Sequence, residues 1–317
     1  MEPINIAIVG SSGAVGTELQ ELLTERNFPQ KELHLYRSSS NPSFAGVDLA
    51  FFCVSEELAK ELIPKALQEN TLCIDASSAY RMDPSVPLVI PEINTEALKK
   101  HSGIIASPNC TTTLMLLPLA SLHQEFHIRR VIATTYQAVS GAGAKGLDEL
   151  KKQTEAHLQG IPLSQEVFPY PCAFNVFLHE SPYSSSGYCE EEEKMHEETQ
   201  KILGDPKIQV SATCVRVPVF RVHSLSLNVE FEREVDLEVA TKMIGSAEGV
   251  ELIQDWDKDR FPTAVDAQKK NRILCGRIRS DHTHPRALEM WVVGDQLLKG
   301  AALNMIQIAE TLYAENP

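Results

Sequence analysis

The sequence has 317 residues, of which 43% are hydrophobic and 23% are charged, a balance typical of a globular protein with room for two domains. Its formal net charge of −14 leaves no excess of cations to meet phosphates, which argues against broad binding of nucleic acid or of anionic membranes. Seven cysteines without a CxxC pair argue against a secreted disulfide framework and favour a cytoplasmic setting. We expect neither a signal peptide nor a membrane helix, because no stretch reaches about 18 apolar residues.

Short apolar strands alternate with helices over the first third of the chain. We expect strands at 5–9, 32–37, 46–54, 71–77 and 103–108, and helices at 17–27 and 56–70. The run at 46–54 is nearly continuous in apolar residues, as in a parallel strand that is buried on both faces. This alternation predicts an α/β fold whose Rossmann-type, mostly parallel sheet is covered by helices on both sides.

The pattern changes after residue 112. An apolar helix is expected at 114–126, and the segments 129–140, 207–220 and 223–232 show the β-branched alternation of longer, half-exposed strands. An amphipathic helix at 294–316 is expected to return to the first domain. The sequence therefore predicts a dinucleotide-binding domain over 1–112 plus 295–317, and an α+β domain with a mixed sheet over 113–294.

A glycine-rich turn joins the first strand to the first helix. Gly10, Gly13 and Gly16 permit a tight turn and close approach of the backbone to a pyrophosphate at the helix N-terminus. A structural turn without a ligand fits the same pattern. Arg37 and Ser38 follow the second strand, where an arginine accommodates the 2′-phosphate of NADP and a carboxylate would hold the ribose of NAD. This position favours NADP(H), with a solvated loop arginine as the alternative.

Cys110 directly follows the strand at 103–108 and starts an apolar helix. A thiolate there is stabilised by the helix dipole and by free amide donors, which can also hold an oxyanion. Other cysteines, such as Cys73 and Cys214, lie inside apolar strands and fit buried small side chains. His223 is a candidate base. In a regular strand Arg216 and His223 would point to opposite faces, but Pro218 interrupts the strand, so both side chains can reach one pocket. Periodicity alone favours a structural histidine at this position.

Several stretches together resemble the aspartate-semialdehyde dehydrogenase family. They are GSSGAVG at 10–16, SSAYRMDPSVPLVIPEIN at 77–94, SPNCTT at 107–112, TYQAVSGAG at 135–143, AFNV at 173–176, RVPVFRVHS at 216–224 and KGAALNMIQIAE at 299–310. The resemblance implies reduction of β-aspartyl phosphate to aspartate-β-semialdehyde with NADP(H), through a thioester, in lysine, threonine, methionine and diaminopimelate biosynthesis. It also implies a cytoplasmic homodimer or homotetramer that associates through the second domain.

The resemblance assigns roles residue by residue. It implies that Cys110 is the nucleophile, that His223 is the acid/base, and that Gln137 orients the acyl intermediate. It implies that Arg216 binds the substrate α-carboxylate and that Glu191 binds its amino group. Further residues match positions for phosphate (Arg81, Asn109, Lys194) and for the cofactor (Gly10, Ser12, Gly13, Ala14, Val15, Gly16, Arg37, Ser38, Ser140, Gly141, Asn304). No metal is expected, because the two histidines of the DHTH segment lack further ligands.

The chain departs from the family pattern near the cofactor. Only five residues separate Ser40 from Gly46, and the glycine-rich turn after the next strand is replaced by CVSEE at 53–57. Glu56 and Glu57 would repel a 2′-phosphate if they pointed inward, so NAD remains an alternative cofactor. Two other functions stay open: an N-acetyl-γ-glutamyl-phosphate reductase, which typically has glycine where this chain has Asn109, and a catalytically silent paralogue that acts as a binding protein.

Overall fold

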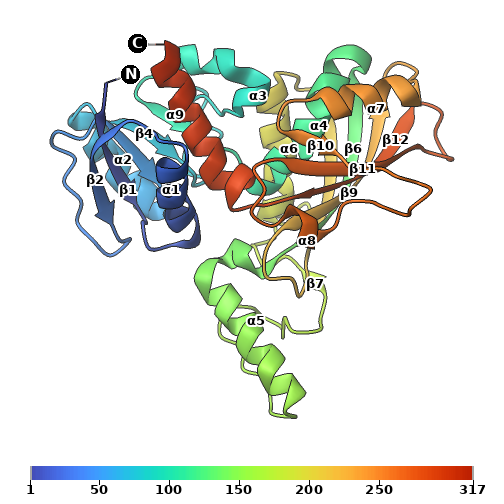
Figure 1. Ribbon diagram of the computed structural model, residues 1–317, viewed down its shortest axis with the longest axis horizontal. Coiled ribbons are helices and arrows are strands. Elements are labelled where there is room, and N and C mark those ends of the chain that lie inside the picture. Colours follow the sequence, from blue (N-terminus) through green and yellow to red (C-terminus); the bar gives the residue numbers. More distant parts are fainter. Residues whose placement is uncertain (1, 316–317) are drawn as a thin grey trace. The chain divides into compact units, whose positions relative to one another are not determined.

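The computed structural model describes residues 2–315 (Figure 1). Contacts between residues divide the chain into two compact units. The first holds the chain up to Cys110, Lys201–Leu203 and the chain from Gly300 onward, and the second holds Thr111–Gln200 and Gly204–Lys299. The domain ranges expected from the sequence differ from these units at each boundary, and Lys201–Leu203 were not expected to lie apart from their neighbours.

The first unit is built on a five-stranded parallel sheet with the order β2-β1-β3-β4-β5. Its strands are β1 (Ile4–Val9), β2 (Gln30–Tyr36), β3 (Leu49–Phe52), β4 (Leu72–Asp75) and β5 (Ile104–Ala106). Each lies within or beside a predicted strand. All four residues of β3 are fully buried, as expected for a parallel strand covered on both faces. The predicted α/β class and the Rossmann-type sheet are confirmed.

Helices cover this sheet. They are α1 (Ala14–Glu25), α2 (Glu56–Gln68), the short α3 (Pro91–Asn94) with the 3₁₀-helix η1 (Thr95–Lys100), and the C-terminal α9 (Leu303–Glu315). Helix α9 packs against α1, α3 and β4. The prediction of one helix from residue 294 was wrong, because Asp295 accepts the backbone N–H groups of Leu297 and Leu298 and a π-helix, η3 (Leu298–Ala302), precedes α9. Asn316, the predicted end of this helix, lies outside the described residues.

The second unit is built on a seven-stranded mixed sheet with the order β10-β11-β12-β9-β6-β8-β7. Strands β6 and β8 are parallel, whereas β9 is antiparallel to both β6 and β12. The strands are β6 (Ile128–Gln137), β7 (Phe177–Leu178), β8 (Gln209–Arg216), β9 (His223–Phe231), β10 (Val250–Leu252), β11 (Ile273–Ser280) and β12 (Ala287–Gly294). The predicted mixed sheet is confirmed. The predicted strands 129–140 and 207–220 both end early, at Gln137 and Arg216.

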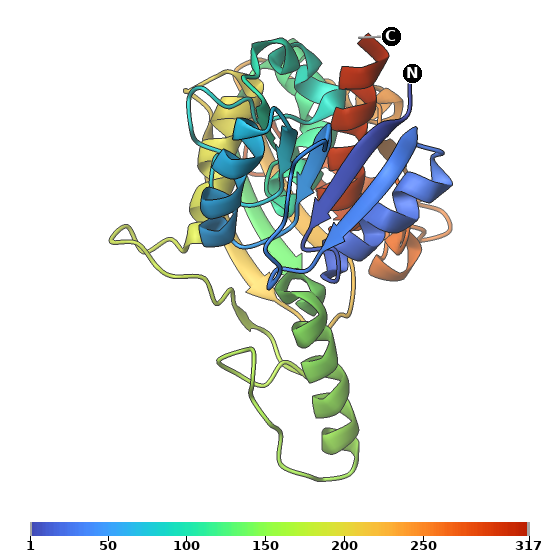
Figure 2. The same cartoon turned by 90° about the vertical axis from the view of Figure 1, so that its left-hand side faces the viewer.

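Several helices of the second unit were not predicted from the sequence, α5 (Gly143–Leu158) among them. The helices of this unit are α4 (Cys110–Phe126), which starts with the last residue of the first unit, the 3₁₀-helix η2 (Val139–Ala142), α5, α6 (Glu190–Leu203), α7 (Leu237–Ser246) and α8 (Ala264–Ala267). Helix α5, which we did not predict, extends away from the seven-stranded sheet together with the segment that follows it (Figures 1 and 2). Within residues 2–315, none of the helices is long and apolar enough to cross a membrane.

Candidate active site

The glycine turn after β1 needs glycine at two positions. Gly10 has φ +90, and a Cβ there would lie 2.2 Å from the carbonyl oxygen of Cys53. A Cβ on Gly16 would lie 2.3 Å from the carbonyl oxygen of Gly10. Helix α1 then begins at Ala14 with no side-chain cap and no acidic residue in its first turn. Its first amide N–H groups therefore remain available to an anion such as a pyrophosphate.

The candidate 2′-phosphate residues lie just beyond β2. Arg37 and Ser38 directly follow the strand, and both are exposed. Glu56, which we expected to repel a 2′-phosphate if it pointed inward, begins α2 and accepts hydrogen bonds from the Ser78 hydroxyl and the Lys60 ammonium, both at 2.6 Å. The lysine offsets the charge of this carboxylate, which weakens the repulsion that we expected.

Cys110 differs from most cysteines of the chain. It is the first residue of α4 and is partly exposed. Cys73 and Cys275 are fully buried, and burial raises the pKa of each thiol to about 12. Such thiols stay protonated and unreactive, whereas the N-terminus of a helix is a position that stabilises a thiolate.

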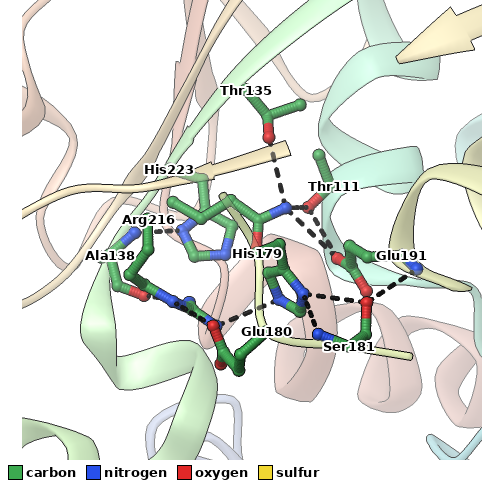
Figure 3. Close-up of polar contacts among 10 residues, drawn as sticks. Thr111, Thr135, Ala138, His179, Glu180, Ser181, Glu191, Arg216 and His223 are labelled. Carbon is green, nitrogen blue, oxygen red and sulfur yellow. Dashed lines mark hydrogen bonds and ion pairs between the residues drawn. The ribbon is translucent and has the colours of Figure 1, made fainter. Parts of the chain in front are cut away.

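Gln137 ends β6 inside a buried network of polar side chains. Its Nε2 lies 3.1 Å from Thr111 Oγ1, 3.3 Å from Thr135 Oγ1 and 3.3 Å from Glu191 Oε1. Figure 3 shows Thr111, Thr135 and Glu191 grouped around this point. Since Thr111 follows Cys110 directly, the network reaches the residue beside the thiol. Gln137 and Glu191, predicted for orientation and for substrate binding, thus lie side by side.

The peptide group of Ala138 joins two other predicted residues (Figure 3). Its N–H donates to Nδ1 of His223 at 3.0 Å, and its carbonyl oxygen accepts from Nη1 of Arg216 at 2.9 Å. A Cβ on Gly141 would lie 3.0 Å from Arg216 Nη1 and 3.7 Å from His223 Nε2, so both side chains pack against this glycine. The break between β8 and β9 lets Arg216 and His223 reach the same place, as the interruption by Pro218 predicted.

His223 is neutral in this environment. It is fully buried, and burial, followed by the positive charge of Arg216, lowers its pKa to about 3. Because Nδ1 accepts the Ala138 N–H, the neutral ring carries its proton on Nε2. Among the described residues, Nε2 has no hydrogen-bond partner. The ring therefore offers one N–H donor to a ligand.

Arg216 is buried and fully engaged. Its Nη2 and Nε lie 2.5 Å and 3.3 Å from the two carboxylate oxygens of Glu180, and Nη2 also lies 3.0 Å from His179 Nε2. Its guanidinium carbon stands 5.4 Å from the centre of the Phe168 ring. The sequence analysis missed Glu180 and His179, which lie in an irregular segment after β7 that carries no periodic signal.

The three predicted phosphate residues have different surroundings. Arg81 is buried, and its guanidinium donates to the carbonyl oxygens of Ser107 at 3.0 Å and of Ala76 at 2.6 Å. Asn109 is also buried. Lys194 lies on α6, is partly exposed, and stands 3.7 Å from a carboxylate oxygen of Glu190. Their role in binding phosphate stays a prediction.

Two predicted cofactor residues are hydrogen-bonded inside their own units. The Ser140 hydroxyl, on η2, accepts from the Gln296 side chain. Nδ2 of Asn304, in the first turn of α9, donates to the Val89 carbonyl oxygen at 2.9 Å and to the Ser107 hydroxyl at 3.0 Å. Both side chains are buried, so each stabilises a loop, whether or not it also contacts the cofactor.

Over residues 2–315, no group of three or more His, Cys, Asp or Glu side chains is arranged to hold a metal ion.

Comparisons with known proteins agree with this arrangement. Residues 37–101 match the family model for the NAD binding domain of semialdehyde dehydrogenase, and residues 119–299 match the model for its dimerisation domain. An aspartate-semialdehyde dehydrogenase of Synechocystis sp. is 46% identical over 329 residues, covering 98% of this chain and 97% of the relative. The crystal structure of aspartate semialdehyde dehydrogenase II from Vibrio cholerae is 38% identical with a TM-score of 0.95, and covers 100% of both chains. A structure of that enzyme complexed with ASA matches at 39% identity, also with a TM-score of 0.95 and 100% coverage of both chains.

Proposed function

This chain belongs to the aspartate-semialdehyde dehydrogenase family, and we propose that it interconverts β-aspartyl phosphate and aspartate-β-semialdehyde with NADP(H), through a thioester on Cys110. One observation carries this proposal. Cys110 starts α4, and the next residue, Thr111, shares the Nε2 group of Gln137 with Glu191. A nucleophile at a helix N-terminus is thus directly followed in the chain by a buried set of groups suited to an amino-acid substrate.

The first step is transfer of the acyl group to sulfur. The Cys110 thiolate attacks the carbonyl carbon of β-aspartyl phosphate, a C–S bond forms, and the C–O bond to phosphate breaks with its electron pair leaving on phosphate. Amide N–H groups at the start of α4 are suited to stabilise both the thiolate and the oxyanion. We assign the leaving phosphate to Arg81, Asn109 and Lys194.

The substrate is held by charges of both signs. Arg216 presents the planar fork of donors that binds a carboxylate in a bidentate manner. The buried carboxylate of Glu191 is suited to pair with an ammonium group, and Gln137 holds that carboxylate in place. Together Arg216 and Glu191 select a substrate that carries both an α-carboxylate and an α-ammonium group. The amide groups of the helix and the Cys110 thiol would not make this selection alone.

His223 acts first as a hydrogen-bond donor. Its Nε2–H is suited to stabilise negative charge on sulfur or on oxygen during acyl transfer. To accept a proton, the ring must be protonated at Nδ1, and the Ala138 N–H must then give up its hydrogen bond. The acid/base role assigned to His223 therefore requires the loss of this contact during turnover.

The uncapped N-terminus of α1 and the turn from Gly10 to Gly16 are suited to a dinucleotide pyrophosphate, with Ser12, Gly13, Ala14 and Val15 around it. The bound dinucleotide supplies the hydride that reduces the acyl group. Arg37 and Ser38 favour the 2′-phosphate form. In this proposal the protein acts as a homodimer or homotetramer in the cytoplasm.

The test follows phosphate-dependent reduction of NADP and of NAD with aspartate-β-semialdehyde, for the wild type and for Cys110→Ala. Cys172→Ala is the matched control, since Cys172 is a buried thiol whose pKa is raised to about 11. We expect activity in the wild type and the control, loss of it in Cys110→Ala, and a preference for NADP. A folded wild type without activity would refute the proposal, and a preference for NAD would refute the role of Arg37.

A further inference from the structure

The guanidinium of Arg216 has one edge at which a carboxylate can bind side-on. One of its nitrogens, Nη1, is held by the Ala138 carbonyl oxygen. The guanidinium carbon lies over the Phe168 ring, 5.4 Å from its centre. Nε and Nη2 form the remaining fork, and in this structure the two carboxylate oxygens of Glu180 occupy it. A side-on contact of this kind is the arrangement in which arginine binds a carboxylate most strongly.

The Glu180 carboxylate reaches solvent, whereas the arginine that it pairs with does not. Arg216 is 1% exposed, and the Glu180 side chain is 22% exposed. Within residues 2–315, Arg216 is the one hydrogen-bond or ion-pair partner that the structure gives to the Glu180 carboxylate. By contrast, Glu191 is buried and held by Gln137 and by other contacts. Of the two carboxylates, Glu180 is the one that is able to move away.

We propose that Glu180 is an internal competitor that sets the affinity of Arg216 for carboxylates: it occupies the Arg216 fork and is displaced when the substrate carboxylate binds. This inference rests on the proposed function, in which Arg216 binds the α-carboxylate of the substrate. Two carboxylates cannot share the fork, so every substrate molecule competes with Glu180. The competition weakens all carboxylate ligands, and it leaves the Cys110 chemistry unchanged.

His179 and Phe168 keep the arginine in position while Glu180 moves. The ring of His179 lies beside the arginine, with Nε2 3.0 Å from Arg216 Nη2. The Ala138 carbonyl oxygen and the Phe168 ring provide two further contacts. Arg216 therefore retains three neighbours when its fork is open, and a ligand finds the guanidinium already oriented.

The kinetic test compares Glu180→Gln with the wild type in phosphate-dependent oxidation of aspartate-β-semialdehyde. The glutamine keeps the shape and one acceptor but removes the charge, and a charged hydrogen bond is about twice as strong as a neutral one. We expect KM for the semialdehyde to fall by about tenfold while kcat and the KM for NADP stay unchanged. If Glu180 merely supports Arg216, KM rises instead, and that result overturns the proposal. Glu155→Gln, on the exposed side of α5, is the matched control and is expected to match the wild type.

A binding measurement separates this inference from the proposed function. Calorimetry with succinate needs no turnover, and we expect the affinity of Glu180→Gln to exceed that of the wild type by about tenfold. Adding Arg216→Met to Glu180→Gln should abolish the gain. This pattern in a protein without activity would reject the proposed reaction and retain the carboxylate competition. Equal succinate affinity in the wild type and Glu180→Gln, or a gain that survives Arg216→Met, would reject the competition. If Glu180→Gln does not fold, Glu180→Asp replaces it in the test. The shorter side chain draws the carboxylate back from the Arg216 fork, so KM for the semialdehyde is again expected to fall.

Discussion

Replacing His223 with asparagine should change how the stability of this protein depends on pH. Burial lowers the pKa of His223 from its ordinary value of 6.5 to about 3. The unfolded chain therefore takes up a proton below about pH 6.5, while the folded protein does so only near pH 3. The stabilising effect of the neutral ring is complete above pH 6.5 and is lost progressively as the pH falls towards 3. Because pH 5 lies about 1.5 units below the ordinary pKa, protonation of the histidine in the unfolded chain lowers the free energy of unfolding there by about 2 kcal/mol.

The assay is chemical denaturation at fixed protein concentration, at pH 7 and at pH 5, for the wild type and for His223→Asn. The asparagine Oδ1 is suited to replace Nδ1 as the acceptor for the Ala138 N–H, but it does not titrate. Other groups titrate equally in both proteins, so the wild type should lose about 2 kcal/mol more than the variant between the two pH values. An equal loss in both proteins would show that His223 is protonated in the folded state at pH 5 and would refute its lowered pKa.

Three further substitutions test the packing around Arg216 and the effect of burial on ion pairs. Gly141→Ala places a Cβ 3.0 Å from Arg216 Nη1, which must shift and weaken its hydrogen bond to the backbone. We expect KM for the semialdehyde to rise by about fivefold, equivalent to about 1 kcal/mol, with little change in Tm, and an unchanged KM would contradict the placement. Asp295→Ala removes a buried carboxylate 2.6 Å from Arg221 and should cost about 3–5 kcal/mol in unfolding free energy. Glu310→Gln, in a partly exposed ion pair, should cost less, about 1 kcal/mol, and similar losses in both variants would contradict the difference in burial.

The first unit followed from the sequence because its signals are local. Strands such as β1, β3 and β5 are short, mainly apolar runs, and Gly10 and Gly16 mark the turn by a steric need that no other residue meets. The last helix was placed less well. Its apolar pattern continues back through the π-helix at Leu298–Ala302, and periodicity does not reveal that the Asp295 carboxylate holds the N–H groups of this segment. Because Asp295 caps the segment before α9, the regular helix begins later than the apolar pattern predicts.

The candidate nucleophile was recognisable for a similar reason, whereas its surroundings were not. Cys110 lies between an apolar strand and an apolar helix, so its place at a helix N-terminus follows from the chain order. Glu180 lies between the two-residue strand β7 and the start of α6, where no period indicates which way a side chain points. Its pairing with Arg216 joins residues 36 positions apart. Such a contact depends on how β7 pairs with β8, and no local pattern in the sequence reveals that pairing.

The central contact of the site has no side-chain signature at all. Arg216 and His223 meet at the peptide group of Ala138, which donates to one and accepts from the other. An alanine in an apolar segment gives no sign that its backbone is needed, so no motif could identify this position. Yet the Ala138 N–H determines which nitrogen of His223 carries the proton. The candidate catalytic set was therefore proposed from the resemblance to the family, whereas the direction in which its histidine donates follows only from the backbone around it.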